Sequence, residues 1–189
     1  MVIHPKNVLS LFSGIAGLDK SVGLVFPESR TVCYVEREAY AASVLVARME
    51  DKALDDAPIW SDITTFNGKE WNGVVDTIIG GFPCQDLSVA GKQAGIKEGN
   101  RSGLFYEYVR IIREINPRYV FIENVSGLLA NGAMSTVLKE LSEMGFDAEW
   151  GMFSAKDVGS THLRKRVFIL AYSQCQLGYT QHDGSFTTA

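Results

Sequence analysis

The sequence predicts an α/β protein built on a doubly wound, mostly parallel sheet that ends in an antiparallel hairpin. The first observation is that short, almost uninterrupted apolar runs alternate along the chain with patterns of helical period. Such runs are typical of parallel strands, which are buried on both faces because crossover helices cover both sides of the sheet. The second observation is that the last two strand-like runs have no convincing helix between them, which favours an antiparallel pair.

Four β-rich runs, each bounded by turn residues, are the predicted parallel strands. They are residues 7–12 (NVLSLF), 31–36 (TVCYVE), 74–81 (VVDTIIGG) and 118–125 (RYVFIENV). Another plausible strand ends at Asp62, in the segment IWSDIT. The alternation of these strands with helical patterns predicts an open α/β sheet.

Apolar stripes predict two of the intervening helices. The first stripe starts at Leu104 and stops before Pro117, which cannot continue a helix. The second stops at Gly145, which we expect to take the left-handed conformation that ends many helices. The stripes consist of Leu104, Tyr108, Ile111, Ile112 and Ile115, and of Met134, Val137, Leu138, Leu141 and Met144. The runs FDAEWGMFSA and RVFILAYS that follow are the predicted hairpin.

Composition limits the class of protein. The 189 residues are 46% apolar and 21% charged, which fits a single domain with a sizeable core. No apolar run is long enough for a membrane span, and the N-terminus does not resemble a secretory signal. The three cysteines, Cys33, Cys84 and Cys175, include no CxxC pair, which argues against a disulfide framework or a zinc site. We therefore expect a cytoplasmic protein that holds no metal.

Charge and patterning also suggest how the chain is organised. We expect residues 1–173 to form the domain, and residues 174–189, which are polar and unpatterned, to be a linker or a cut edge. The net charge is −4. Because phosphate contacts supply most of the affinity for nucleic acid, such a function would need a local basic patch or protein that this chain does not contain.

A glycine loop, SGIAGLDKSVGL, follows the first predicted strand. Gly14 and Gly17 would allow a tight turn and the close approach of a ligand to a helix start. The loop is neither GxGxxG nor GxxxxGK[ST], so the dinucleotide and P-loop patterns are not met. Glu36 and Asp62 end later strands, where acids accept hydrogen bonds from ribose hydroxyls or an exocyclic amine. This series favours a nucleoside ligand without a pyrophosphate, such as S-adenosylmethionine; an ordinary turn with solvated acids is the alternative.

The segment GGFPCQD places Cys84 just past the carboxyl end of a predicted strand, where open α/β sheets bind their ligands. Pro83 has a fixed φ and restricts Phe82, so the direction of the thiol is set. As a thiolate, Cys84 would be a strong nucleophile. The alternative is a buried structural cysteine, which is how we interpret Cys33; Cys175 has no assigned role.

Polar residues at the next strand ends complete the candidate site. Glu123 and Asn124 leave the same sheet edge as Cys84, one strand over, where an acid can act as a proton donor, a base or a hydrogen-bond partner. Arg164 and Arg166, in HLRKRVFILA, would point to one face of a strand and could reach the same cleft. The alternative is an edge strand that is protected by charge.

Together these segments resemble the C5-cytosine methyltransferase family, in the family's order, from about residue 7 to residue 172. LFSGIAGLD resembles its cofactor loop, GGFPCQDLSVAGKQAG its nucleophile loop, NRSGLF the following segment, FIENV its acid motif and HLRKRVFILA its QxRxR motif. The resemblance implies a Rossmann-like, S-adenosylmethionine-dependent methyltransferase fold that acts on double-stranded DNA.

The resemblance also implies roles for particular residues. The Cys84 thiolate would add to C6 of a flipped-out cytosine, so that C5 takes the methyl group before β-elimination frees the cysteine. Glu123 would bind the N3 and amino side of the base, while Arg166, with Arg164 nearby, would contact O2. The implied cofactor residues are Phe12, Ser13, Gly14, Ile15, Ala16, Gly17, Leu18, Glu36, Asp62, Ile63, Pro83 and Leu104. The implied DNA-binding residues are Gln85, Ser88, Lys92 and Asn124.

Two departures from the family pattern affect the expected activity. His162 occupies the position of the usual glutamine in QxRxR. A target-recognition domain and a late asparagine-containing motif are not visible in the sequence. We therefore expect the catalytic part of a split or truncated enzyme, which methylates poorly without a second chain or a missing C-terminal half.

Three other functions fit parts of the sequence. A tRNA cytosine-5 methyltransferase would use the same chemistry, although the GFPCQ form and the lack of a Cys-Phe-Thr segment lean towards DNA. An inactive stub that binds a cofactor or a partner would fit the missing half. An NAD-dependent dehydrogenase is disfavoured by the glycine loop.

Overall fold

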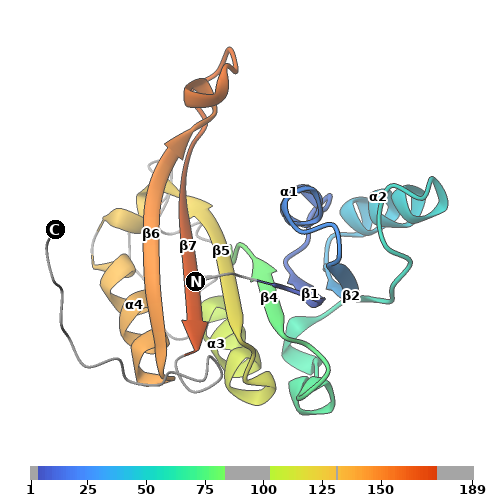
Figure 1. The fold of residues 1–189 in the computed structure, drawn as a ribbon, viewed down its shortest axis with the longest axis horizontal. Coiled ribbons are helices and arrows are strands. Elements are labelled where there is room, and N and C mark those ends of the chain that lie inside the picture. The colour runs from blue at the N-terminus through green and yellow to red at the C-terminus, as the bar shows by residue number, and fades with distance from the viewer. Residues whose placement is uncertain (1–3, 84–102, 131, 174–189) are drawn as a thin grey trace, which may run out of the picture.

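The computed structural model describes residues 4–83, 103–130 and 132–173 of the chain. A seven-stranded sheet in the order β3-β2-β1-β4-β5-β7-β6 runs through the molecule (Figure 1). Its strands are β1 (Asn7–Leu11), β2 (Arg30–Val35), β3 (Ile59–Trp60), β4 (Thr77–Gly80), β5 (Tyr119–Val125), β6 (Phe146–Ser154) and β7 (Lys165–Ser173). β1 to β5 are parallel, β7 pairs antiparallel with β5, and β6 pairs antiparallel with β7. The predicted fold class is therefore confirmed.

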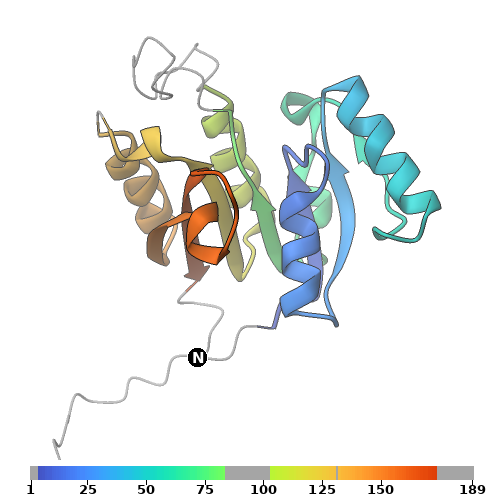
Figure 2. The same cartoon turned by 90° about the horizontal axis from the view of Figure 1, so that it is seen from above.

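Helices cover both faces of the sheet (Figure 2). They are α1 (Gly17–Val25), α2 (Ala39–Glu50), α3 (Leu104–Ile115) and α4 (Ala133–Glu143). Neighbouring residues of β4 show the two layers, because Ile79 packs with Val22 of α1 while Ile78 belongs to the core cluster that contains α3 and α4. This two-sided burial is the reason that β4 is apolar at consecutive positions.

The two predicted helical stripes are core-facing. Tyr108, Ile111 and Ile112 are at most 1% exposed, and α3 ends at Asn116, which adopts a left-handed conformation before Pro117. Gly145, just after α4, also has a positive φ of 81°. Both predicted helix ends are therefore confirmed, and their stop signals act as expected.

The strand around residues 59–62 is shorter than the sequence suggests. β3 has two residues, and Asp62 follows as the N-cap of a 3-10 helix, η1 (Ile63–Thr65). Three more 3-10 helices among the described residues are η2 (Gly68–Trp71), η4 (Ser126–Leu129) and η5 (Ala155–Val158). η5 joins the two strands of the hairpin, so the connection contains one short turn of helix.

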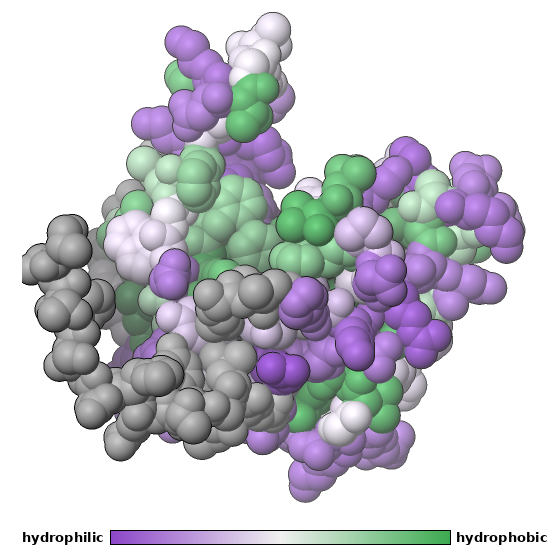
Figure 3. Space-filling model, in the orientation of Figure 1, coloured by the Kyte–Doolittle hydropathy of each residue, from purple (hydrophilic) through white to green (hydrophobic). Residues whose placement is uncertain are grey.

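One stretch of the sheet face beside α1 is apolar and open to solvent. Between α1 and the β5–β7 strands lies a pocket of about 270 Å³, whose lining includes Val25, Phe121 and Leu170. Phe168 stacks on Phe121 with ring centroids 5.9 Å apart, and Phe153, which is 58% exposed, packs at the edge of this pair. Figure 3 shows apolar surface in this region, beside α1 and at the root of the hairpin.

Candidate active site

The carboxyl ends of the parallel strands open into a pocket of about 590 Å³. Its walls come from the segments that follow β1, β2, β3 and β4, which is where open α/β sheets bind ligands. Six of the predicted cofactor residues line it: Phe12 after β1, Glu36 after β2, Asp62 and Ile63 after β3, Pro83 after β4, and Leu104 at the start of α3. The fold thus brings together residues that are up to 92 positions apart in the sequence, because Phe12 and Leu104 both line this pocket.

A second pocket of about 420 Å³ shares Phe12 and Gly81 with the first. Its lining includes the predicted cofactor-loop residues Ser13, Gly14, Ile15, Gly17 and Leu18. It also includes Glu123 and Arg164, two of the predicted catalytic residues. The larger pocket and the candidate catalytic acid are therefore neighbours across Phe12 and Gly81.

The glycine loop is held by Glu36. The backbone N–H of Gly14 donates to Oε2 of Glu36 over 2.7 Å, and the N–H of Glu38 donates to Oε1 over 2.7 Å. Each carboxylate oxygen accepts one of these bonds and keeps a further lone pair. Glu36 can therefore organise the loop and still accept hydrogen bonds from a ligand.

The turn itself differs from the sequence-based expectation in one respect. Gly14 has a positive φ of 55°, which suits the tight turn predicted there, but Gly17 begins α1 without a positive φ. The other left-handed residues of the loop are Phe12 at 54° and Ala16 at 60°, although such values are uncommon for residues with a Cβ. Ala16 is fully buried and packs with Tyr34, so its side chain lies in the core and lines neither pocket.

Asp62 is half-buried and is fixed by its own segment. Its Oδ1 accepts hydrogen bonds from the Thr64 hydroxyl over 2.8 Å and from the Thr64 N–H over 3.0 Å. These two bonds lower the pKa of Asp62, the hydroxyl having the larger effect. The carboxylate is thus charged at neutral pH at the rim of the larger pocket, suited to accept a hydrogen bond from an amine.

Glu123 and Arg166 form an ion pair across the β5–β7 pair. Arg166 Nε lies 2.7 Å from Glu123 Oε1, and the two side chains are only 23% and 31% exposed. Arg164 precedes β7, so the prediction that it shares a strand with Arg166 is wrong, but it lines the smaller pocket with Glu123. The structure therefore gathers all three described members of the predicted catalytic set.

Gly81 lets the GGFP turn approach β5. A Cβ at this position would lie 2.4 Å from the backbone oxygen of Glu123 and 3.3 Å from its Oε2. A Cβ does not approach a backbone oxygen as closely as 2.4 Å in real structures, so only glycine fits between the two segments. Oε2, the carboxylate oxygen that is not paired with Arg166, is consequently the one nearest the turn.

Asn124 is only 5% exposed and is part of the same turn. Its Nδ2 donates to the carbonyl of Phe82 over 3.1 Å, while its Oδ1 accepts from the N–H of Val125 over 2.8 Å. The burial argues against the direct DNA contact predicted for Asn124. The side chain instead holds the backbone of Phe82, the residue before Pro83.

Several predicted residues cannot be compared with the structure. Cys84, Gln85, Ser88 and Lys92 lie outside the described residues, as does the segment 174–189. The interpretation of Cys33 as a structural thiol is confirmed, because it is 1% exposed and burial raises its pKa to about 11. His162 is exposed, with Nδ1 2.7 Å from the hydroxyl of Ser160.

Two charged residues of the site region are absent from the sequence-based prediction. Asp19, in the first turn of α1, is buried and accepts hydrogen bonds from the hydroxyls of Ser10 over 2.9 Å and Thr31 over 3.0 Å. Burial raises its pKa, which these hydrogen bonds partly offset. Arg110 of α3 is the second; its only sequence signal is the spacing of Glu107 and Glu114 on either side of it.

The described part of the chain contains neither a group of metal ligands nor a membrane-spanning helix. No group of three or more histidine, cysteine, aspartate or glutamate side chains is placed there to hold a metal ion. None of the helices in residues 4–83, 103–130 and 132–173 has the length and apolar character to cross a membrane.

Residues 6–187 match the family model for "C-5 cytosine-specific DNA methylase". The chain is 35% identical over 175 residues to the Type II methyltransferase M.NgoPII of Neisseria gonorrhoeae, covering 89% of this chain and 48% of that protein. It is 34% identical to M.CviJI of a Paramecium bursaria Chlorella virus, covering 87% of this chain and 42% of that protein. It is also 31% identical to M.AquIA of Picosynechococcus, covering 87% of this chain and 71% of that protein.

Solved structures show the same fold. The DNMT2 mutant of Spodoptera frugiperda aligns with a TM-score of 0.72 at 23% identity, over 95% of this chain and 54% of that one. The Dnmt2 methyltransferase of S. pombe aligns with a TM-score of 0.69 at 22% identity, over 96% and 51%. The chain thus spans about half the length of most of these proteins.

Proposed function

We propose that this chain, which belongs to the C-5 cytosine-specific DNA methylase family, carries the catalytic site of a DNA cytosine-5 methyltransferase. The observation that supports the proposal best is the adjacency of the two pockets. One offers an aromatic ring and two acids to a nucleoside, and the other is lined by Arg164 and by Glu123, whose Oε1 is paired with Arg166.

The residues of the larger pocket fit S-adenosylmethionine. When bound, this cofactor supplies an activated methyl group on a sulfonium. Phe12 offers an aromatic face to the adenine, Glu36 offers carboxylate oxygens to the ribose hydroxyls, and Asp62 offers an acceptor to the exocyclic amine. A volume of about 590 Å³ lies within the usual range for small-molecule sites.

Catalysis in this proposal begins at Cys84, as the family resemblance implies. The thiolate forms a bond to C6 of a flipped cytosine, and the electron pair displaced from the C5–C6 double bond makes C5 nucleophilic. After C5 has gained the methyl group, loss of the C5 proton and cleavage of the S–C6 bond restore the double bond and the thiolate. Nothing is oxidised or reduced in the protein.

Glu123 would stabilise the base during attack. The ion pair with Arg166 occupies Oε1, which leaves Oε2, on the Gly81 side, to contact the N3 and amino edge of the cytosine. Arg164 lines the same pocket and provides a cation for the O2 side. Charged groups that are already oriented before reaction stabilise developing charge at little further cost.

We also propose that efficient methylation needs protein beyond the described part of this chain. The curated relatives M.NgoPII and M.CviJI are matched over less than half of their length, and the chain has a net charge of −4. A partner segment would have to supply base-sequence readout and a basic DNA surface. The second candidate, a binding module that turns nothing over, is favoured by the same half-length match.

Two measurements test the proposal. Calorimetric titration with S-adenosylmethionine, with NAD as the control ligand, should show binding of the first alone. Incubation with S-adenosylmethionine and duplex DNA that contains 5-fluorocytosine should then give a covalent adduct, because fluorine at C5 prevents the final elimination. Binding without an adduct would favour the binding module, while binding of NAD would contradict the cofactor assignment.

A further inference from the structure

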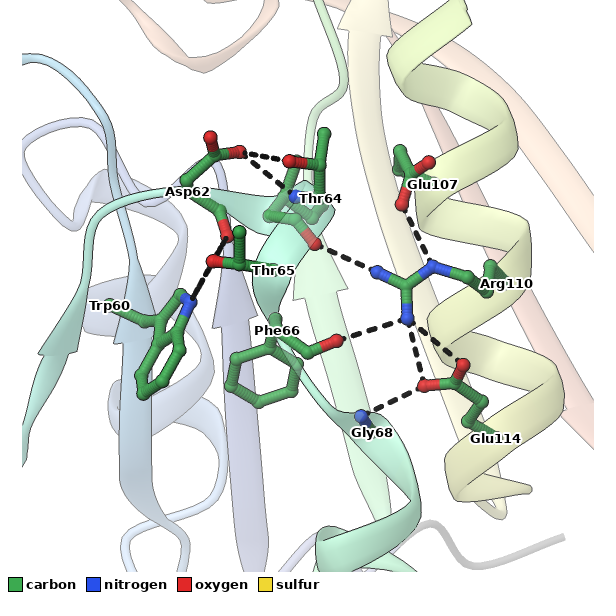
Figure 4. A network of polar contacts seen from close by, with 10 residues as sticks. Trp60, Asp62, Thr64, Thr65, Phe66, Gly68, Glu107, Arg110 and Glu114 are labelled. Atoms are coloured by element: carbon green, nitrogen blue, oxygen red, sulfur yellow. Dashed lines mark hydrogen bonds and ion pairs between the residues drawn. The ribbon is translucent and has the colours of Figure 1, made fainter.

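Arg110 connects two walls of the larger pocket. It lies in α3, the helix that begins with the pocket residue Leu104, and its guanidinium reaches the segment that carries Asp62 and Ile63 (Figure 4). Nη2 donates to the carbonyl of Ile63 over 2.8 Å, and Nη1 donates to the carbonyl of Phe66 over 3.0 Å. One side chain therefore bonds both ends of the η1 segment to α3.

The guanidinium is itself held in place by two acids of its own helix. Nε donates to Glu107 Oε2 over 2.8 Å, and Nη1 lies 2.9 Å from Glu114 Oε2. Glu114 Oε2 also accepts the N–H of Gly68 over 2.8 Å, which attaches the start of η2 to the same group. All three guanidinium nitrogens are thus engaged, in a planar arrangement that a lysine cannot reproduce.

The segment that Arg110 holds has little other regular structure. β3 contributes two residues and η1 three, and 3-10 helices of this length are weak by themselves. Trp60 Nε1 donates to the carbonyl of Asp62 over 3.0 Å and so reports on the same segment. In contrast, α3 is anchored by a fully buried apolar stripe and provides a rigid support.

We infer that Arg110 is a positioning residue for nucleoside binding, which acts by fixing Asp62 and Ile63 relative to Leu104. The inference rests on the proposed cofactor site. It assigns to Arg110 no contact with the ligand, because Arg110 does not line the pocket. Arg110 matters for the geometry of the pocket wall and adds little to the free energy of folding, because ion pairs of a side chain that is about one-third exposed contribute little to stability.

Arg113 provides a matched control on the same helix. It forms a comparable ion pair, with Nη2 2.7 Å from Glu140 Oε2, but it bonds to α4 and not to the pocket wall. Arg110→Lys and Arg113→Lys both keep the charge and the helix propensity. Only the first removes the simultaneous bonds to Ile63 and Phe66.

The experiment compares the affinity of the full chain and the two variants for S-adenosylmethionine by calorimetry, below the unfolding transition of each. We expect Arg110→Lys to raise Kd by roughly fivefold to tenfold, as the loss of about one net hydrogen bond in the wall predicts. We expect Arg113→Lys to leave Kd within about twofold. Without ligand, the indole N–H resonance of Trp60 should shift in Arg110→Lys alone.

Each result has a distinct meaning. If the unaltered chain binds and both variants bind with the same Kd as the unaltered chain, the role of Arg110 alone is overturned. If both variants instead show the same increase in Kd, the role of Arg110 is also overturned, because this would reveal a general effect on α3. Absence of binding by the unaltered chain would overturn the proposed cofactor site, and this inference with it. If Arg110→Lys does not fold, Glu107→Gln, which removes one charged partner of Arg110, should shift the Trp60 resonance and raise Kd by a smaller factor.

Discussion

Arg166 Nε lies 2.7 Å from Glu123 Oε1, on a diagonal across the antiparallel pair in which Glu123 faces Phe168 and Val125 faces Arg166. The antiparallel direction of β7 is what makes this meeting possible. It returns the chain so that an arginine near the start of β7 lies beside an acid near the end of β5. The pair is therefore a product of topology, and it fixes one oxygen of the candidate catalytic acid.

Arg166→Lys should slow formation of the covalent adduct on 5-fluorocytosine DNA by about 10-fold to 100-fold, because an ammonium does not reproduce the guanidinium geometry at Glu123. The Kd for S-adenosylmethionine should change less than about twofold, because Arg166 lines neither pocket. Lys165→Gln, one residue away and exposed, is the control. An adduct rate that is unchanged in Arg166→Lys would remove Arg166 from the site.

Glu36→Gln should weaken S-adenosylmethionine binding by about tenfold. The amide keeps one acceptor oxygen, so it cannot accept from the N–H groups of both Gly14 and Glu38. Glu38→Gln makes the same change of charge in a residue that lines the same pocket. Calorimetry should therefore find a large effect for Glu36 and a small one for Glu38; similar losses would mean that only net charge matters there.

Gly81→Ala should destabilise the fold by about 3 kcal/mol, because the added methyl group overlaps the Glu123 carbonyl and forces two segments apart. Gly23→Ala, inside α1, meets nothing within 4 Å and should be neutral or stabilising by up to about 1 kcal/mol. Urea unfolding of both variants measures these changes. Equal midpoints for Gly81→Ala and the parent chain would contradict the close approach at the turn.

Asp19→Asn should stabilise the protein increasingly as the pH rises from about 4 towards neutrality. Burial raises the pKa of Asp19 in the folded state, so the folded chain binds this proton more tightly than the unfolded chain. The resulting stabilisation is complete below the unfolded pKa and is lost as the pH rises through the folded pKa. The amide mimics the protonated acid and does not suffer this loss.

Urea unfolding at several pH values checks the Asp19 prediction. Each tenfold difference in proton affinity between the folded and unfolded states corresponds to about 1.4 kcal/mol. Asp56→Asn, an exposed acid changed to an amide, controls for the general effect of net charge. A stability difference between Asp19→Asn and the parent that is constant with pH would show that Asp19 does not titrate as proposed.

The sequence predicts the parts of this molecule that depend on local patterns. The apolar runs, the stripe of α3 and the stop at Gly145 each have a period or a residue type that determines their structure, and all three are confirmed. The pocket residues after β1, β2 and β4 follow from the rule that parallel strands end at one edge. Resemblance to a family added the roles of Glu123 and Arg166, which no local pattern contains.

What the sequence does not reveal depends on pairs that meet only in the folded chain. Arg110 looks like an ordinary surface arginine between two acids until η1 folds against α3. Asn124 looks like a polar residue at an open strand end, yet its buried side-chain amide donates a hydrogen bond to the carbonyl of Phe82. Phe12 and Ala16 take left-handed conformations that glycine would be expected to occupy, because the surrounding core and the Glu36 bonds fix the loop.

The cluster of Phe121 on β5, Phe168 on β7 and Phe153 on β6 affects how the chain behaves in concentrated solution. Phe153 of the outermost strand β6 is 58% exposed and packs against Phe168 of the stacked Phe121–Phe168 pair, and Trp150 of the same strand is 50% exposed. A nine-residue edge strand that carries such side chains is a template for attachment of other chains. Light scattering should therefore increase with protein concentration, and mild detergent should suppress this increase more effectively than salt does.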